Sequence, residues 1–447
     1  MQALLNRLKD VNAGAFIVMS ILLLALLLNG ANNAAGAALL SLTLLALLFA
    51  TILMTSAGRL SRTLRANWIS VLGALAFVAL AATTAFMSPQ ELQAHPLWSI
   101  VGGADAPLSV SPYRTIEGVV ALCGPLSAFL LGALYAPSRE ARDWVGRWAI
   151  ALGALYSFAG LYLFYAVGGN PRLDVDVGSA NAAAALFGTL MVIAATLIAR
   201  GARGRLGKTS HALDHWGWGA GRLVLSAPVS FAVLLALFAC LLLTASRGGL
   251  VATSVALIIF LSALLAQSMT RGGARGAVAL APIGLLIAVL AVLFVRGGED
   301  VLARFALAGD DWEVRRVLAD AHYAHFLERP LFGHGLNTYH ELNMLAITPE
   351  NWRMLGAPGS AHNIFIQALE ETGVAGLTLW VLMLAPLLAR ALWRLARGEG
   401  GVEWAAAALA MSALLLLHGL VDFALQVPAI AAFYAFMLGA SVGAPQR

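Results

Sequence analysis

Charged residues are scarce in this chain. Lys, Arg, Asp and Glu together make up 11% of its 447 residues, less than half of the roughly 25% found in ordinary soluble domains. A compact soluble fold of this length needs a polar surface that so few charges cannot supply. Because 60% of the residues are hydrophobic, a disordered chain is excluded as well. The composition predicts a polytopic membrane protein.

Cysteine is also nearly absent. Cys123 and Cys240 both lie inside apolar runs, so neither is expected to form a disulfide or bind a metal, and both are expected to pack as small hydrophobic side chains. The net charge of +5 does not indicate a nucleic-acid partner, because the basic residues fall in short loops between apolar runs.

Long apolar runs fill most of the sequence. About twelve of them reach the roughly 20 residues that a helix needs to cross a bilayer. The first is followed at once by the second, so it is expected to be an uncleaved anchor rather than a signal peptide. The predicted spans are 11–30, 34–56, 68–88, 115–136, 148–168, 179–199, 227–245, 249–268, 278–295, 363–389, 404–421 and 428–444.

Alternate loops differ sharply in charge. Nineteen of the 28 basic residues fall on one side of the predicted spans. Basic residues in short loops mark the cytoplasmic side of a membrane, so both termini are predicted to be cytoplasmic. The basic positions on that side lie at 7–9, 59–65, 139–147, 200–222, 271–275, 390–397 and 447.

The opposite side carries one large polar segment, residues 297–361. It holds 14 of the 51 charged residues and four of the nine histidines. Long polar insertions between spans are usually functional. We therefore divide the chain into spans one to nine (1–296), a large extracytoplasmic loop (297–362) and spans ten to twelve (363–447), and expect the site on the extracytoplasmic face.

The loop itself contains a predicted helix and a return to the membrane. The helix is expected to be capped by Asp310 or Asp311 and to stop before Pro330. Gly333 and Gly335 then permit a turn in which the backbone comes close to a ligand or to a neighbouring helix. Further on, Ser360 is the predicted N-cap of the tenth span, which places His362 and Asn363 in its positive first turn.

Other polar residues map to the same membrane level. Arg247 ends the seventh span, Arg114 opens the fourth above Glu117, and Asp422 closes the eleventh. Apart from Glu370 and Glu371, the span interiors hold almost no ionisable groups. This pattern disfavours an ion or proton path through the bilayer and favours a site at one interface.

Arginines, a histidine and helix amides at a membrane surface suit a polyanionic head group. One guanidinium group can donate two parallel hydrogen bonds to phosphate oxygens, and several such groups can neutralise a pyrophosphate leaving group without a metal. An imidazole can accept the proton of an attacking hydroxyl. These parts fit glycosyl transfer from a lipid pyrophosphate to an acceptor hydroxyl.

Several short motifs occur in one order along the chain. This arrangement resembles the O-antigen ligase and polymerase superfamily of bacterial envelope glycosyltransferases, and the motifs cover about a quarter of the chain. The motifs are Ser246-Arg247-Gly248, Asn181 in an Ala-rich span, Arg315 about fifteen residues before Pro330-Leu331, Gly333-x-Gly335, His362-Asn363, Gln367, and Glu371-x-Gly373-x-x-Gly376.

The resemblance implies an all-α integral membrane enzyme with a fold similar to the GT-C class. Its donor would be a glycan on undecaprenyl pyrophosphate, its acceptor the lipid A–core oligosaccharide, and it would be an inverting enzyme that needs no metal or other cofactor. It would lie in the bacterial inner membrane with its site facing the periplasm. By motif position His362 would be the catalytic base. Pyrophosphate would be bound by Arg247, Arg315, Arg316 and Arg114. Supporting roles would fall to Ser246, Asn363, Gly333, Gly335, Asn181, Glu371 and Asp422.

Alternatives remain at this point. A polymerase would use a second lipid-linked repeat as acceptor, and a protein O-oligosaccharyltransferase a Ser or Thr hydroxyl; a single large loop favours the ligase. A lipid-linked glycan flippase would need polar groups along a path through the spans, and a non-catalytic scaffold would tolerate loss of the histidine and arginines. The four loop histidines, His322, His325, His334 and His340, include an i, i+3 pair but show no clear third metal ligand.

Overall fold

The computed structural model describes residues 11–86, 107–167, 172–206 without 176 and 178, 228–272, 308–398 and 401–443. Every regular element in this part of the chain is a helix. The helices are α2 (Val11–Leu27), α3 (Ala34–Met54), α4 (Ala57–Ala66), α5 (Trp68–Phe86), α7 (Pro112–Tyr135), α8 (Arg139–Tyr162), α9 (Ala180–Leu206), α11 (Pro228–Leu243), α12 (Arg247–Gly272), α16 (Ala308–Glu328), α17 (Tyr339–Ala346), α18 (Trp352–Leu355), α19 (Ile364–Arg397), α20 (Val402–His418) and α21 (Pro428–Leu438). Shorter helical turns are η1 (Asn29–Ala31), η2 (Leu163–Val167), η4 (Ala424–Gln426) and η5 (Gly439–Gly443).

The helices that match the predicted spans carry the apolar sequence of a membrane protein. Seven described helices are long and apolar enough to cross a bilayer, and four shorter apolar helices accompany them. Eleven of the predicted spans fall on these helices, while the predicted span 278–295 lies outside the described residues. The prediction of an all-α integral membrane protein is confirmed.

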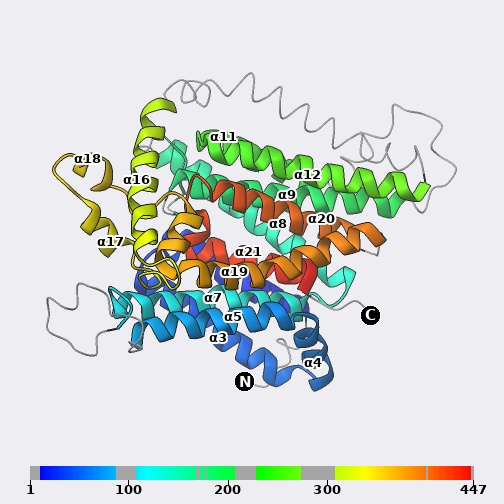
Figure 1. Cartoon of the computed structure of the whole chain (residues 1–447). Coiled ribbons are helices and arrows are strands. Elements are labelled where there is room, and N and C mark those ends of the chain that lie inside the picture. Colours follow the sequence, from blue (N-terminus) through cyan, green and yellow to red (C-terminus); the bar gives the residue numbers. More distant parts are fainter. Residues whose placement is uncertain are drawn as a thin grey trace.

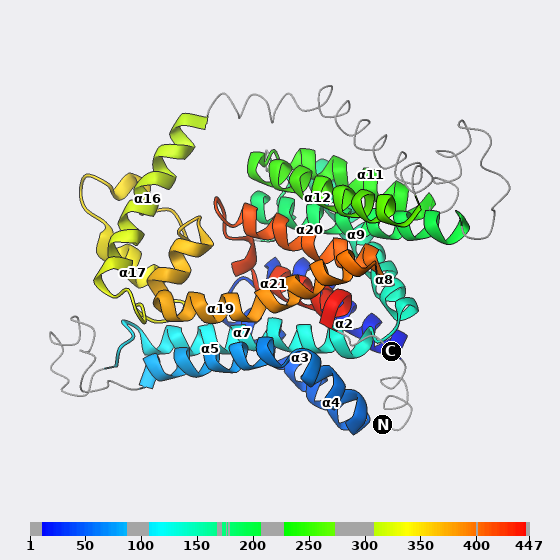
Figure 2. The same cartoon turned by 45° about the vertical axis from the view of Figure 1, so that its right-hand side comes forward.

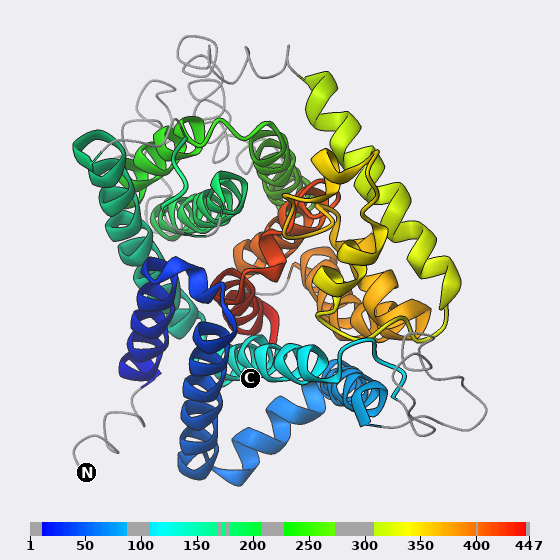
Figure 3. The same cartoon turned by 90° about the vertical axis from the view of Figure 1, so that its left-hand side faces the viewer.

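The long helices form one bundle, and the loop helices lie across one end of it. In Figures 1 and 2 the bundle helices run roughly side by side, with α16 crossing their ends and α17 and α18 beside it. Figure 3 looks along the bundle and shows α9, α20 and α21 toward its middle. Among the seven described helices that are long enough to cross a bilayer, α9 is the most buried: 94% of its most apolar 18-residue stretch lies inside the protein. Its alanines let neighbouring helices approach closely.

Helix α4, absent from the predicted elements, lies at the end of the bundle away from α16 (Figure 1). It is a short amphipathic helix that carries Arg59, Arg62 and Arg65. The amide of Asn67, just after it, donates a hydrogen bond to the carbonyl of Gly443 at 2.7 Å. The C-terminal end of η5 and this arginine-bearing helix therefore lie at the same end of the bundle.

Helix α19 is broken one-quarter of the way along by a loop segment that packs into it. Gly373 has φ +64° inside the helix, a conformation that strongly favours glycine. The backbone N–H groups freed by the break donate to loop carbonyls: that of Val374 to Pro330 at 2.8 Å and that of Ala375 to Leu331 at 3.0 Å. In return, the N–H of His334 donates to the carbonyl of Glu370 at 2.9 Å. These hydrogen bonds pair the backbone groups that the break in α19 leaves open, and they attach the loop to the helix.

The start of α16 and the cap of α19 both differ from the prediction. Helix α16 begins at Ala308 rather than at an aspartate cap at 310 or 311, and it ends at Glu328, before Pro330 as expected. Ser360 is not the cap of α19. The cap is Asn363, whose side-chain oxygen accepts hydrogen bonds from the N–H groups of Phe365 and Ile366 at 3.0 and 3.1 Å. An Asx side chain directly before the helix reaches these amides better than a serine three residues earlier.

Candidate functional site

Among the helices that begin at the end of the bundle that α16 crosses are α9, α12 and α19. Helix α9 is capped by Ser179, whose hydroxyl accepts from the N–H of Ala182 at 3.0 Å. Helix α12 is capped by Ser246, which accepts from the N–H of Gly249 at 3.2 Å, and α19 is capped by Asn363. The N-terminus of a helix carries partial positive charge and unpaired amides. Their convergence makes this end of the bundle attractive to an anion.

A pocket lies at the starts of α9 and α12, with about 360 Å³ of space that includes its opening to solvent; His362 and the start of α19 are not among its lining residues. Three arginines line it, and one carboxylate. Its charged and polar lining residues are Arg172, Asn181, Ser246, Arg247, Arg315, His418 and Asp422. The pocket therefore combines cationic side chains with helix N-termini, as a phosphate or pyrophosphate site requires.

Hydrogen bonds tie several of these residues into a chain. Arg172 Nη2 donates to Asn181 Oδ1 at 2.8 Å, and Asn181 Nδ2 donates to Asp422 Oδ2 at 2.5 Å. Arg172 Nε also donates to the carbonyl of Thr244 at 2.8 Å. These contacts join α9 to the segment after α20 and hold the Arg172 guanidinium at the pocket wall.

His362 lies beside this chain in an unusual backbone conformation. Its φ is +49°, which is uncommon for a residue other than glycine and is found mostly where function requires it. His362 Nδ1 is 3.7 Å from Asp422 Oδ2, and the imidazole side chain is 25% exposed. The ring meets that of Phe423 edge-on at 5.3 Å. The separation from Asp422 exceeds a hydrogen bond, but catalytic contacts are often long before substrate binds.

Asp422 is almost completely buried, 1% exposed. Burial alone would raise its pKa, but interactions with His362 and His418 outweigh it, so the pKa of Asp422 is lowered from its ordinary value. Asp422 is therefore a carboxylate at neutral pH. Its negative charge thus lies beside the His362 ring, 3.7 Å from Nδ1.

The four arginines predicted to bind pyrophosphate do not all lie at this pocket. Arg247 and Arg315 line it, whereas Arg316 and Arg114 are not among its lining residues. Arg316 is exposed on α16. Arg114 donates hydrogen bonds to Glu117 at 3.0 Å and to Glu341 at 3.1 Å, contacts that join α7 to the loop helix α17.

Three of the predicted supporting residues hold the loop in place beside the site. A Cβ on Gly333 would lie 2.5 Å from the backbone of Glu371, and one on Gly335 would lie 2.3 Å from Ser109 Oγ, so neither position accepts a larger residue without movement. The carboxylate of Glu371 accepts hydrogen bonds from the N–H of Asn337 at 2.8 Å and from Gln367 Nε2 at 2.9 Å. Glu371 does not contact His362, as the sequence indicated.

Two residues of the site escaped the sequence reasoning. Arg172 follows the fifth predicted span, in a loop too short to attract attention, and its position on the less basic side of the membrane was the signal available. His418 is buried at the C-terminal end of α20 and lines the pocket. A histidine in an apolar span is ordinarily a packed core residue, so its sequence context gave no indication of the pocket.

Comparison with known proteins bears on the central part of the chain. Residues 231–381 match the family model described as O-Antigen ligase. No curated protein matches the chain. The matched region includes Arg247, Arg315 and His362, while Arg172 and Asp422 lie outside it. The resemblance to the O-antigen ligase superfamily that the motifs indicated is thus confirmed over residues 231–381, about a third of the chain.

Proposed function

We propose that the chain is an O-antigen ligase: an inverting glycosyltransferase that moves a glycan from undecaprenyl pyrophosphate to the lipid A–core oligosaccharide. The observation that carries this proposal is the meeting of two helix N-termini and three arginines in one pocket, whose Asp422 lies beside His362. The family match over residues 231–381 supports the same class of reaction.

The cationic pocket is the proposed donor site. Arg172, Arg247 and Arg315 line one cavity, and paired guanidinium contacts neutralise charge on phosphate oxygens. The starts of α9 and α12, which both line the cavity, add partial positive charge. This charge stabilises the pyrophosphate as it becomes a leaving group, so the transfer step itself needs no metal.

The histidine is the proposed acceptor site. The acceptor O–H would give its proton to His362 while its oxygen attacks the anomeric carbon of the donor sugar. The bond from that carbon to the pyrophosphate oxygen breaks, and its electron pair leaves with undecaprenyl pyrophosphate. Asp422 orients the imidazole and stabilises its positive charge. A single displacement of this kind inverts the anomeric configuration.

We also propose that the pocket faces the periplasm from the bacterial inner membrane, with both termini cytoplasmic. Two observations support this orientation. The arginine-bearing helix α4 and the C-terminal end of η5 lie together at the end away from α16, and basic segments mark the cytoplasmic side. Labelling of single cysteines at Ser56 and at His340 in intact and lysed cells tests it, since only the second should react from outside.

Transfer by purified protein tests the activity. The protein is given a lipid-linked glycan with lipid A–core, a second lipid-linked repeat or a Ser/Thr peptide, and the products are identified. We expect glycosylated lipid A–core, and a loss of about 10²- to 10⁴-fold in His362→Ala. His340→Ala is the matched control, because His340 is an exposed loop histidine away from the pocket.

Other outcomes would redirect or refute the proposal. Extended lipid-linked glycan would identify a polymerase, and glycosylated peptide a protein O-oligosaccharyltransferase. Movement of the lipid-linked glycan between leaflets without transfer would identify a flippase. Near-normal ligation by folded His362→Ala would remove the histidine from the mechanism.

A further inference from the structure

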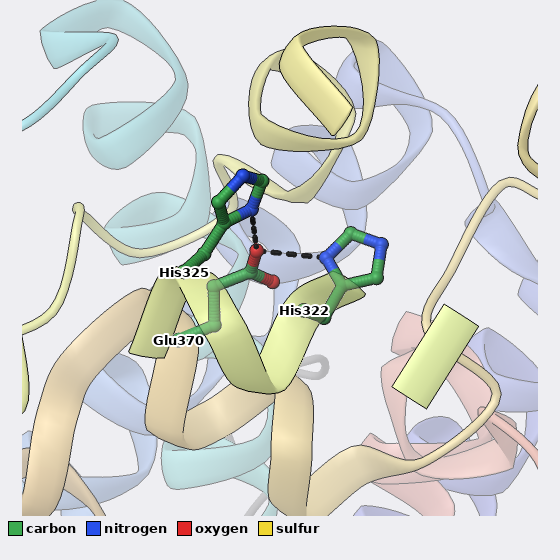
Figure 4. Close-up of side chains that lie close together, drawn as sticks. All are labelled: His322, His325 and Glu370. Carbon is green, nitrogen blue, oxygen red and sulfur yellow. Dashed lines mark hydrogen bonds and ion pairs between the residues drawn. The ribbon is translucent and has the colours of Figure 1, made fainter. Parts of the chain in front are cut away.

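A second cluster of chemically active side chains lies between α16 and α19. His322 Nδ1 is 2.7 Å from Glu370 Oε1, and His325 Nδ1 is 3.0 Å from the same oxygen. The three ligand atoms lie within 4.8 Å of one another. Figure 4 shows the two imidazoles of α16 and the carboxylate of α19 directed toward one point. Glu370 supplies the third ligand that the sequence spacing did not reveal.

The hydrogen bonds of His322 indicate which of its nitrogens carries a proton. Asn343 Nδ2 donates to the carbonyl of Leu355 at 2.8 Å, which orients the amide so that its oxygen faces His322 Nε2 at 3.3 Å. Nε2 therefore carries a hydrogen and donates it. The lone pair of neutral His322 Nδ1 then points at a carboxylate oxygen, an arrangement that requires a proton or a cation between the two atoms. Metal-binding histidines characteristically donate their other ring N–H to such an oxygen.

The burial of the carboxylate gives an independent indication. The side chains of His322 and Glu370 are 0% exposed, and that of His325 is 13% exposed. Glu370 Oε2 is buried and has no hydrogen-bond partner among the described residues. A carboxylate oxygen withdrawn from water without a partner is costly, whereas a cation bound by both carboxylate oxygens would remove that cost.

We propose that His322, His325 and Glu370 bind one zinc ion that joins the loop helix α16 to the membrane helix α19. Two imidazole nitrogens and a carboxylate are a donor set that zinc accepts, with the second carboxylate oxygen or a water completing four ligands. Ligand atoms in a tetrahedral zinc site are about 3.4 Å apart. The observed separations require only small side-chain movements to reach that value.

The proposed ion is structural and separate from the transfer chemistry. Arg315 lies seven residues before His322, on the same face of α16 and about 10 Å along its axis. Fixing α16 to α19 at the histidines therefore also fixes the helix that carries Arg315 to the cationic pocket. The metal inference does not depend on the proposed function, because its tests measure metal binding alone.

Metal analysis of the purified full-length protein is the direct test. The protein is prepared with a tag that contains no histidine, stripped with a chelator, and titrated with Zn²⁺ and separately with Co²⁺. We expect about one ion per chain and a raised melting midpoint with zinc, together with the visible absorption of tetrahedral cobalt. Glu370→Gln and His325→Ala should lose the ion, and His340→Ala, the control, should retain it.

A variant that is expected to gain a spectroscopic signal distinguishes loss of a metal ligand from loss of the fold. His325→Cys keeps a zinc ligand of similar reach, so its cobalt form should show an added sulfur-to-metal charge-transfer band that the parent protein lacks. Absence of metal uptake by the stripped parent protein at micromolar zinc would overturn the proposal, and would identify the cluster as a buried ion pair. Equal uptake by the parent, Glu370→Gln and His325→Ala would overturn it too.

Discussion

Arginines lie at both ends of helix α9, but Arg200 at one end and the arginines at the other differ in their surroundings. At the inner end, away from α16, Arg200 forms ion pairs with both Asp143 and Glu403, the latter at 3.3 Å. Trp404 Nε1 completes the cluster by donating to Asp143 Oδ1 at 2.9 Å. At the outer end, about 28 Å along the helix, Asn181 belongs to a pocket lined by three arginines and one carboxylate.

This difference separates a structural cluster from a binding site. The inner arginine is matched by carboxylates of neighbouring helices, so it holds α8, α9 and α20 together and has no charge left for a ligand. The outer pocket is lined by three arginines and one carboxylate, and helix N-termini add partial positive charge. Such a lining attracts an anion, which the guanidinium groups can contact directly.

The largest expected effect comes from removing the single carboxylate of the outer pocket. Asp422→Asn keeps the shape but loses the charge beside His362, so we expect turnover to fall by about 100-fold or more. The matched change at the inner end, Asp143→Asn, should lower stability and leave turnover of the folded protein close to normal. Turnover measured at saturating donor and acceptor, with melting midpoints for both variants, checks the contrast. Equal effects of the two changes on turnover would refute it.

Breaking the inner cluster is expected to affect stability most. Arg200→Met leaves two carboxylates without their partner in a largely buried site, which costs about 3 kcal/mol or more in the free energy of unfolding. Denaturation in detergent measures this loss. Because the cluster is not a ligand site, donor binding by the surviving folded protein should not change. Weaker donor binding with unaltered stability would contradict the division between the two ends.

The sequence predicted the elements well because their cause is local. Long apolar runs specify spans regardless of their neighbours, and the stop of α16 before Pro330 follows from proline geometry. His362, Arg247 and Arg315 could be placed at one membrane level by counting along the spans. Whether they share a cavity depends on how the helices pack, and that packing put Arg114 with Glu117 and Glu341 instead.

What the sequence could not supply were partners from distant segments. Arg172 is held at the pocket by the carbonyl of Thr244 and by Asn181, which in turn contacts Asp422, and these residues lie far from one another along the chain. In the sequence Glu370 is only one of the few ionisable residues inside the predicted spans, and its two histidine partners come from α16. Both cases depend on tertiary contacts between a loop and a span, for which no local pattern exists.

The pocket arginines should respond to a loss of geometry as well as of charge. Arg315→Lys keeps the charge but replaces the planar fork by a single ammonium, so we expect the KM for the lipid-linked donor to rise about tenfold or more. Arg316→Lys, one residue along and exposed, is the control and should change KM little. Steady-state kinetics with the donor as varied substrate distinguish the two. A similar response of both variants would show that α16 contributes only general positive charge.

The smallest expected effect concerns the start of α19, where Asn363 holds the first amides of the helix beside the His362–Asp422 pair. Asn363→Ala removes the oxygen that accepts from Phe365 and Ile366, and loss of such a cap costs about 1 kcal/mol. Asn363→Asp retains an acceptor and should restore stability, although its added charge beside the pocket should weaken donor binding. Melting midpoints together with donor affinity separate these two contributions. If Asn363→Asp instead bound the donor as tightly as the parent protein, the bound phosphates would lie too far from the start of α19 to sense its charge, and the anion site would consist of the arginines and the starts of α9 and α12 alone.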